Sequence, residues 1–238
     1  MNAKHFVVTA PGVMMLMLAG VLWYVLLFAF VLFNGARTTH WPRAWALLGV
    51  LLVTRLAGDF WITSANPDLL AERARGPLQQ GQPLFDRVLV PAFMAALAVA
   101  TWVAAADVWR WHLLPAPAPW LAALGMVLYV AGRWLVSAAL HANAFATMVV
   151  RHQAERGQAV VDRGPYAIVR HPMYSGVVLA AIGLPLWLGS TTGVLAALVP
   201  ILIMAVRIVA EERFLRRVLD GYASYASRVR HRLVPGVW

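Results

Sequence analysis

Residues 11–33 read PGVMMLMLAGVLWYVLLFAFVLF, a run of 23 residues without a charged side chain. A helix needs about 20 apolar residues to cross the hydrocarbon core of a bilayer. Further apolar segments follow, and glycine and proline interrupt the last two, which are the shortest. The six segments are 11–33, 44–62, 88–106, 120–140, 173–189 and 193–210. We therefore predict an all-α fold, a polytopic membrane helix bundle with about six transmembrane segments, of which the last two form a bent or tilted hairpin.

The composition agrees with a membrane protein and excludes several classes of function. Hydrophobic residues make up 61% of the chain and charged residues only 13%, far from the balance of a soluble domain. The chain has no cysteine, which excludes disulfides, thiolate metal sites and a cysteine nucleophile. Its net charge of +10 lies in the connectors, where anionic lipid headgroups attract it. We therefore expect membrane lipids and no nucleic acid as partners.

Basic residues in the connectors predict the orientation. With the N-terminus inside, the cytoplasmic side collects fourteen of the twenty lysines and arginines, and the outer side holds only Arg37, Arg43 and Arg110. An excess of basic residues marks the cytoplasmic side, so both termini should be cytoplasmic. The fourteen are Lys4, Arg73, Arg75, Arg87, Arg151, Arg156, Arg163, Arg170, Arg213, Arg216, Arg217, Arg228, Arg230 and Arg232.

We expect one membrane domain over residues 1–238, with four spans in 1–140 and a functional region in 141–238. The connector 63–87 should contain a short interfacial helix. Residues 107–119, where three prolines alternate with other residues, should form a tight outer loop because proline breaks helices. In the tail, residues 212–233, apolar residues recur every three to four positions between arginines. This period predicts an amphipathic helix on the membrane surface.

Three arginines fall within the predicted spans, where charge is costly and often functional. Arg55 and Asp59 stand four residues apart and should form an ion pair on one helical face, for which a structural role is favoured. Arg133 has no partner nearby in sequence and should face the bundle interior or a wet cavity. Arg207 and Glu211 repeat the four-residue spacing, but Glu212 adds a second carboxylate that one arginine cannot neutralise as well.

A polar run precedes the fifth apolar segment, at residues 164–176, GPYAIVRHPMYSG. Together with the carboxylates at 211–212, this run indicates a polar ligand held at a membrane surface. The chain has no dinucleotide-binding glycine motif, no phosphate-binding loop and no metalloprotease helix. Its histidines are scattered singly, so we predict no metal site.

The ordered set of motifs resembles the isoprenylcysteine carboxyl methyltransferase family. The set comprises Gln153-Ala-Glu155, residues 160–166, residues 170–176, Arg207-x-x-x-Glu211-Glu212 and Gly221-Tyr-x-x-Tyr225. The resemblance covers roughly residues 140–238 and implies a cytosolic pocket for S-adenosylmethionine, with the acceptor arriving from the bilayer. An alanine- and arginine-rich chain almost without lysine is typical of a bacterial member, which would lie in the inner membrane.

The resemblance also implies roles for single residues. Arg207 matches the arginine at the acceptor, so it is the expected catalytic and substrate-binding residue. Glu211 matches the carboxylate at the cofactor's amino-acid end. The other expected cofactor contacts are Gln153, Gln158, Ala159, Val160, Val161, Tyr166, His171, Pro172, Met173 and Tyr174.

The expected function is a membrane methyltransferase that acts on a lipophilic small molecule or lipid-modified cysteine, with an isoprenylcysteine-type carboxylate favoured. Transfer to an ionised carboxylate needs positioning and desolvation but no general base. Phospholipid amine and thiol methylation remain alternatives, for which His171 or Tyr166 would be candidate bases. A sterol-type NADPH reductase and a non-enzymatic membrane protein also remain open.

Overall fold

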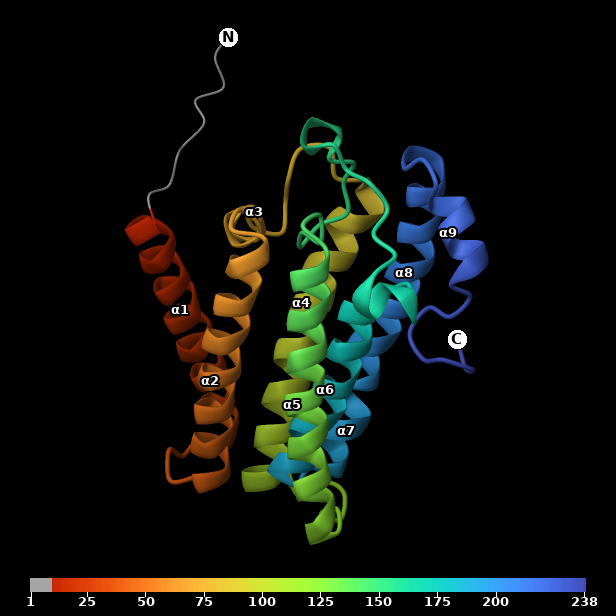
Figure 1. Cartoon of the computed structure of the whole chain (residues 1–238). Coiled ribbons are helices and arrows are strands. Elements are labelled where there is room, and N and C mark those ends of the chain that lie inside the picture. The colour runs from red at the N-terminus through yellow and green to blue at the C-terminus, as the bar shows by residue number, and fades with distance from the viewer. Residues whose placement is uncertain (1–9) are drawn as a thin grey trace.

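The computed structural model describes residues 10–238, so Lys4 and His5 lie outside the described residues. The described part is helical, with helices joined by turns and loops and no strand (Figure 1). The elements are α1 (Ala10–Ala36), α2 (Pro42–Ala65), α3 (Leu69–Ala74), α4 (Leu84–Ala106), η1 (Asp107–Trp111), α5 (Pro119–Ala142), η2 (Ala154–Arg156), η3 (Gly164–Ala167), α6 (Pro172–Leu188), α7 (Thr191–Ala196), α8 (Leu198–Val218) and α9 (Tyr222–Arg228).

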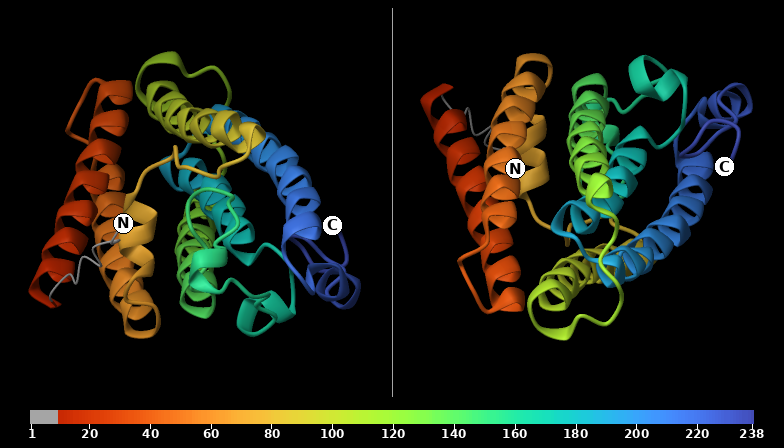
Figure 2. Two further views of the ribbon diagram at one scale, coloured as in Figure 1. Left: turned by 90° about the horizontal axis from the view of Figure 1, so that it is seen from above. Right: turned by 90° about the horizontal axis from the view of Figure 1, so that it is seen from below.

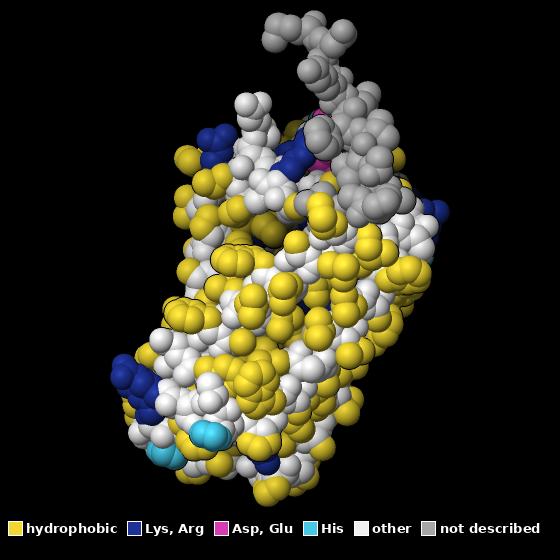
Figure 3. All heavy atoms as spheres, turned by 90° about the vertical axis from the view of Figure 1, so that its left-hand side faces the viewer, with side chains coloured by type: hydrophobic (Ala, Val, Ile, Leu, Met, Phe, Trp, Pro, Cys, Tyr) yellow, Lys and Arg dark blue, Asp and Glu magenta, His cyan; other side chains and the backbone are white. Residues whose placement is uncertain are grey.

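The predicted all-α membrane bundle is confirmed. Five helical stretches are long and apolar enough to cross a membrane by length and composition, whereas α6, Pro172–Leu188, is a shorter apolar helix. Hydrophobic side chains dominate the face seen in Figure 3, and the visible Lys and Arg side chains gather mainly near its two ends. An outer surface of this kind suits a lipid environment, so the chain is an integral membrane protein.

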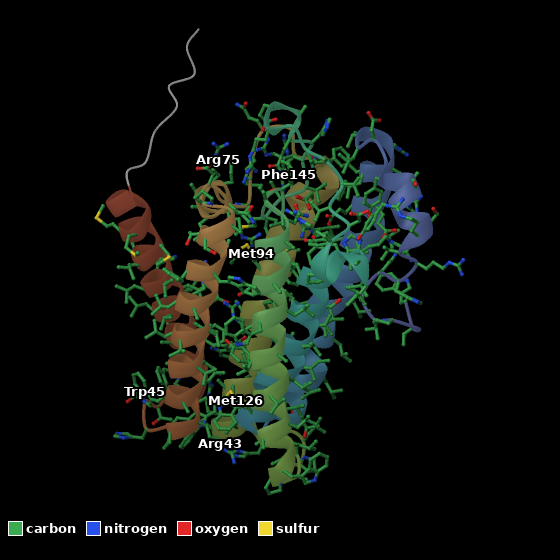
Figure 4. The ribbon with its side chains drawn as sticks, viewed as in Figure 1. Arg43, Trp45, Arg75, Met94, Met126 and Phe145 are labelled. Carbon is green, nitrogen blue, oxygen red and sulfur yellow. The ribbon has the colours of Figure 1, made fainter. Side chains whose placement is uncertain are left out.

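The helices alternate in direction and leave polar segments at both ends of the bundle (Figure 1). One end carries α3, residues 143–171 and α9, and we call it the motif end. Arg75 lies at this end and Arg43 at the opposite one (Figure 4). Arg75 and Arg43, which the sequence analysis assigns to opposite sides of the membrane, therefore lie at opposite ends of the structure. The predicted short helix in the connector 63–87 is α3.

Helices α5 and α6 pack closely through glycines and thereby place the polar run of residues 164–176. A Cβ atom on Gly125 would lie 2.7 Å from the Gly183 carbonyl oxygen, and one on Gly183 would lie 2.6 Å from the Tyr129 nitrogen. Gly132 and Gly176 approach each other in the same way about two turns closer to the motif end. Small residues at such positions let two membrane helices come into backbone contact. The two helices run side by side in both views of Figure 2.

The predicted hairpin of the last two spans has a different shape. Helix α6 continues through Pro185 and ends at Gly189, whose φ of +91° is the left-handed conformation that commonly terminates a helix. The short α7 then begins at the cap Ser190, whose Oγ accepts a bond from the Gly193 nitrogen at 2.7 Å. Helix α8 extends beyond the predicted end at 210 and reaches Val218.

The prediction of a loop over all of residues 107–119 is wrong at its start. Asp107–Trp111 continues α4 as a π-helix, and only the segment that follows is irregular. The buried Asp107 carboxylate accepts bonds from Ser190 Oγ at 2.7 Å and Thr192 Oγ1 at 2.9 Å. These contacts with the start of α7 hold Asp107–Trp111 in its helical conformation. The prolines break the helix only in the segment that follows.

The prediction of one surface helix over residues 212–233 is also wrong. Helix α8 runs to Val218, and Gly221, with φ of +80°, turns the chain into the separate short helix α9. Tyr222 and Tyr225 are buried and pack against Val160 and other apolar side chains of the protein. The apolar face of the tail therefore covers the motif end and does not lie on lipid.

Candidate active site

A cavity lies at the motif end between the loop after α5, the start of α6 and the inner side of α8 and α9. Counting the space at its mouth, it holds about 820 Å³. All predicted site residues except Pro172 line it; Pro172 is the first residue of α6 and is buried beside it. The lining residues predicted from the sequence are Gln153, Gln158, Ala159, Val160, Val161, Tyr166, His171, Met173, Tyr174, Arg207 and Glu211.

The loop after α5 forms one wall of the cavity and is braced by its own glutamines. Gln153 is buried, and its Nε2 atom donates to the Phe145 carbonyl at 2.8 Å while its Oε1 atom accepts from Arg156 at 2.6 Å. The Gln153 nitrogen donates to Gln158 Oε1 at 2.8 Å. Phe145 lies at the motif end in Figure 4. The Gln153 side chain therefore stabilises the loop itself, and residues 158–161 of the same loop line the cavity.

Glu211 is a carboxylate that lines the cavity without a basic partner. The Tyr174 hydroxyl donates to Glu211 Oε2 at 2.7 Å. Within residues 10–238, no Lys, Arg or His side chain lies at ion-pair distance from Glu211. The direct Arg207–Glu211 pair that the spacing allowed is replaced by a contact through Tyr174. The negative charge of Glu211 is left available to a cationic ligand.

Arg207 pairs instead with Asp86 from the start of α4. Its Nε atom donates to Asp86 Oδ1 at 2.7 Å, and its other nitrogens donate to the Tyr174 hydroxyl and to the Met148 carbonyl, the latter at 3.0 Å. Asp86 is fully buried and also accepts from the Val150 nitrogen at 2.8 Å. The sequence does not mark Asp86 as a candidate, because it looks like an ordinary acidic residue in the connector just before the predicted span 88–106.

Glu212 is buried and joins three basic side chains. It accepts from Arg170 Nε at 2.6 Å and from Arg232 Nε at 3.1 Å, and His171 Nε2 lies 3.1 Å away. Arg170 also donates to the carbonyls of Val229 and Arg230 at 2.7 and 2.8 Å. The Arg-His-Pro step thus fastens the segment after α9 onto α8.

Tyr166 and His171 differ in what they can do chemically. Burial raises the pKa of Tyr166 to about 12, an effect that the nearby Arg73 charge partly offsets. Tyr166 therefore remains a protonated hydroxyl near neutral pH. His171 has one ring nitrogen committed to Glu212, and its ring stacks on Tyr174 with centroids 5.5 Å apart. Neither residue is a free general base in this arrangement.

Of the charged residues in the predicted spans, Arg55, Asp59 and Arg133 do not line the cavity. Arg55 Nε and Asp59 Oδ2 are 2.8 Å apart, which confirms the predicted ion pair. Arg133 does not line the cavity, and its buried Nε atom has no hydrogen-bond partner among the residues that the structure describes. Arg55 and Asp59 thus lie on α2 and Arg133 on α5, outside the candidate site.

Comparisons with known proteins cover the same region. Residues 120–221 match the family model described as phospholipid methyltransferase. Protein-S-isoprenylcysteine O-methyltransferase B of Arabidopsis thaliana is 30% identical over 113 residues, which are 46% of this chain and 57% of that protein. The match therefore spans little more than half the length of this curated relative. These findings confirm the resemblance inferred from the motifs, and the matched residues 120–221 include every predicted site residue.

Proposed function

We propose that this membrane protein transfers a methyl group from S-adenosylmethionine to a lipophilic acceptor, because residues 120–221 match the family model described as phospholipid methyltransferase. An isoprenylcysteine-type carboxylate is the favoured acceptor, in line with the name of the curated relative. The observation that carries the proposal is Glu211, a carboxylate that lines the cavity and has only a tyrosine hydroxyl as partner.

The lining residues fit the cofactor. S-adenosylmethionine carries a positive sulfonium and an ammonium group, and Glu211 supplies the negative charge that an ammonium would meet in a charge-assisted bond. The segment 158–161 offers backbone groups to the adenosyl part, as the resemblance implies. When bound, the cofactor supplies an electrophilic methyl group. The residues of this chain bind it and keep water from the reacting atoms.

The acceptor end of the site favours an already ionised group. A carboxylate needs no proton removed before it attacks, so positioning and desolvation suffice. Tyr166 stays protonated and His171 is bonded to Glu212, which leaves neither as a ready base. In the proposal Arg207 acts at the acceptor and holds the Tyr174 hydroxyl, which in turn donates to Glu211.

A phospholipid amine is the second candidate acceptor, because the matching family model is described by phospholipid methylation. An ammonium headgroup must lose a proton before transfer. A methyl-transfer assay with a lipophilic carboxylate and an aminophospholipid as separate acceptors distinguishes the two candidates. We expect label from S-adenosylmethionine in the carboxylate product.

Replacing Glu211 with glutamine tests the cofactor assignment. We expect the affinity for S-adenosylmethionine to fall by a free energy of about 1.5–3 kcal/mol, because a charge-assisted bond to the ammonium is lost. Calorimetric titration of the purified variant in detergent measures the change. The control is Asp162→Asn, which removes an exposed carboxylate that pairs with exposed Arg228. Unchanged affinity in a folded Glu211→Gln protein would place the cofactor elsewhere.

We further propose that the motif end faces the cytoplasm, where S-adenosylmethionine is made, and that the membrane is a bacterial inner membrane. The fourteen-to-three distribution of basic residues supports this orientation. Cysteines introduced at Gln158 and Trp238 should be shielded from an impermeant reagent in intact cells, and one at Ala118 should react. The chain has no other cysteine, so the background is low. Labelling of Gln158 from outside would reverse the orientation and contradict the proposed function.

A further inference from the structure

The arginines around the cavity are mostly neutralised by carboxylates of the protein. Arg207 pairs with Asp86 and Arg170 with Glu212. Arg151, which also lines the cavity, pairs with Glu72 and Glu155. Each of these three arginines therefore already has a carboxylate of the protein at ion-pair distance. This bears on the acceptor, because an anionic group enters a low-dielectric site at low cost only where an opposite charge awaits it.

Arg73 on α3 is different from these three. Its Nη1 atom donates to the Ala146 carbonyl at 2.7 Å and lies 3.9 Å from Met173 Sδ. Ala146 and Met173 both line the cavity. No carboxylate lies at ion-pair distance from Arg73 in the part of the chain from 10 onwards, and residues 1–9 contain no Asp or Glu.

The neighbouring charges do not compensate Arg73. Glu72, next to it in sequence, accepts from Arg75 at 2.9 Å and from Arg151 at 3.3 Å. Burial, together with the positive charge of Arg55, lowers the pKa of Arg73 to about 10. Arg73 is therefore still protonated at neutral pH.

Arg73 also stands where a molecule from the bilayer would present a polar head. Helix α3 packs through Leu69 and Leu70 against Ile62, Leu140 and Met173, at the motif ends of α2, α5 and α6. The first turns of α4, the next helix, expose Leu84 and Val88. In Figure 3 a recess lined by hydrophobic side chains lies just below the basic side chains at the upper end. An apolar tail can remain at such a surface while its charged end reaches Arg73.

We propose that Arg73 is the specificity-determining residue that binds the anionic head of the methyl acceptor, on the cavity side formed by Ala146 and Met173. This inference rests on the proposed function and adds to it a residue from the N-terminal half of the chain, outside the matched region 120–221. Arg207 and Arg73 then have different roles. Arg207, held by Asp86, positions Tyr174, and Arg73 supplies the positive charge that selects a carboxylate.

The test compares two ligands with the same tail, S-farnesyl-N-acetylcysteine and its uncharged primary amide. Calorimetry on detergent-solubilised protein gives the ratio of their dissociation constants without any turnover. We expect the wild-type protein to prefer the carboxylate by about tenfold or more, the range expected for a hydrogen bond to a charged group. Arg73→Gln should abolish this preference, and Arg73→Lys, which keeps the charge, should retain most of it.

The matched control is Arg75→Gln, two residues away, which removes an exposed guanidinium paired with Glu72 and should keep the full preference. The proposal is overturned if folded Arg73→Gln protein still prefers the carboxylate, or if Arg75→Gln loses the preference equally. Should Arg73→Gln not fold, a wild-type protein without preference for the carboxylate overturns the proposal by itself. Failure of the proposed function looks different, because the wild-type protein would then neither bind S-adenosylmethionine nor methylate any acceptor.

Discussion

Replacing Glu212 with glutamine is expected to lower the free energy of unfolding by about 3–5 kcal/mol, the usual cost of removing one partner from a buried ion pair. Glu212 is 3% exposed and accepts from Arg170 and Arg232. Glutamine has nearly the same shape but carries no charge, so Arg170 would be left buried without a negatively charged partner. The segment after α9, which Arg170 holds, should loosen as well. Chemical unfolding in detergent micelles, followed by tryptophan fluorescence, measures the loss.

The control for this experiment is the adjacent residue. Glu211→Gln removes a carboxylate with one hydrogen-bond partner, the Tyr174 hydroxyl, and should change the stability of the ligand-free protein much less. The two neighbouring substitutions should therefore have different effects. Glu212→Gln should lower the stability, and Glu211→Gln should lower the affinity for the cofactor. Equal stability of the Glu212→Gln and wild-type proteins would show that the three basic partners of Glu212 are satisfied without its charge.

Replacing Asp86 with asparagine should have an effect of similar size on stability and a second effect on the site. Arg207 is 6% exposed, and Asp86 is the carboxylate that neutralises it. Leaving the arginine unpaired should lower the free energy of unfolding by about 3–5 kcal/mol. The freed guanidinium is also only one tyrosine away from Glu211. It can turn to that carboxylate and compete with a cationic cofactor, so the affinity for S-adenosylmethionine should fall together with stability.

Asp59→Asn is the matched control, because Asp59 is another buried acid paired with an arginine of the spans, and that arginine, Arg55, does not line the cavity as Arg207 does. It should lower stability and leave the affinity for S-adenosylmethionine of the folded protein unchanged. Thermal unfolding and calorimetric titration of both variants give the two quantities separately. If Asp86→Asn binds the cofactor as tightly as the wild-type protein does, Arg207 does not compete for Glu211.

The helices could be predicted from the sequence because hydropathy is a local property. The run 11–33 lies within α1, and the proline at position 42 or 119 begins a helix where the missing N–H costs nothing. The helix boundaries could not be predicted where a residue far along the chain decides them. The π-helix after α4 persists because Asp107 bonds to Ser190 and Thr192, more than eighty residues later.

The composition of the candidate site was also largely predictable, since its residues follow one another in short motifs around 153–174 and 207–211. Their individual tasks were not. Gln153 matches a cofactor contact, yet it braces its own loop. Tyr222 and Tyr225 follow the pattern of a surface helix, yet they are buried over the cavity. In both cases the sequence shows the type of residue and its spacing, but it does not show which part of the protein the side chain contacts.

The sequence by itself determined that this chain crosses a membrane, which connectors carry its basic residues, and which residues can meet a polar ligand. Only the tertiary structure decided how the charges are paired. Arg207 takes Asp86 from 121 residues away instead of Glu211 four residues away. Glu212 pairs with three basic side chains, and Glu211 has none at ion-pair distance within residues 10–238. The physical reason is that a buried charge binds whichever opposite charge the packing of distant helices brings within reach, and sequence spacing shows only the partners on the same helix.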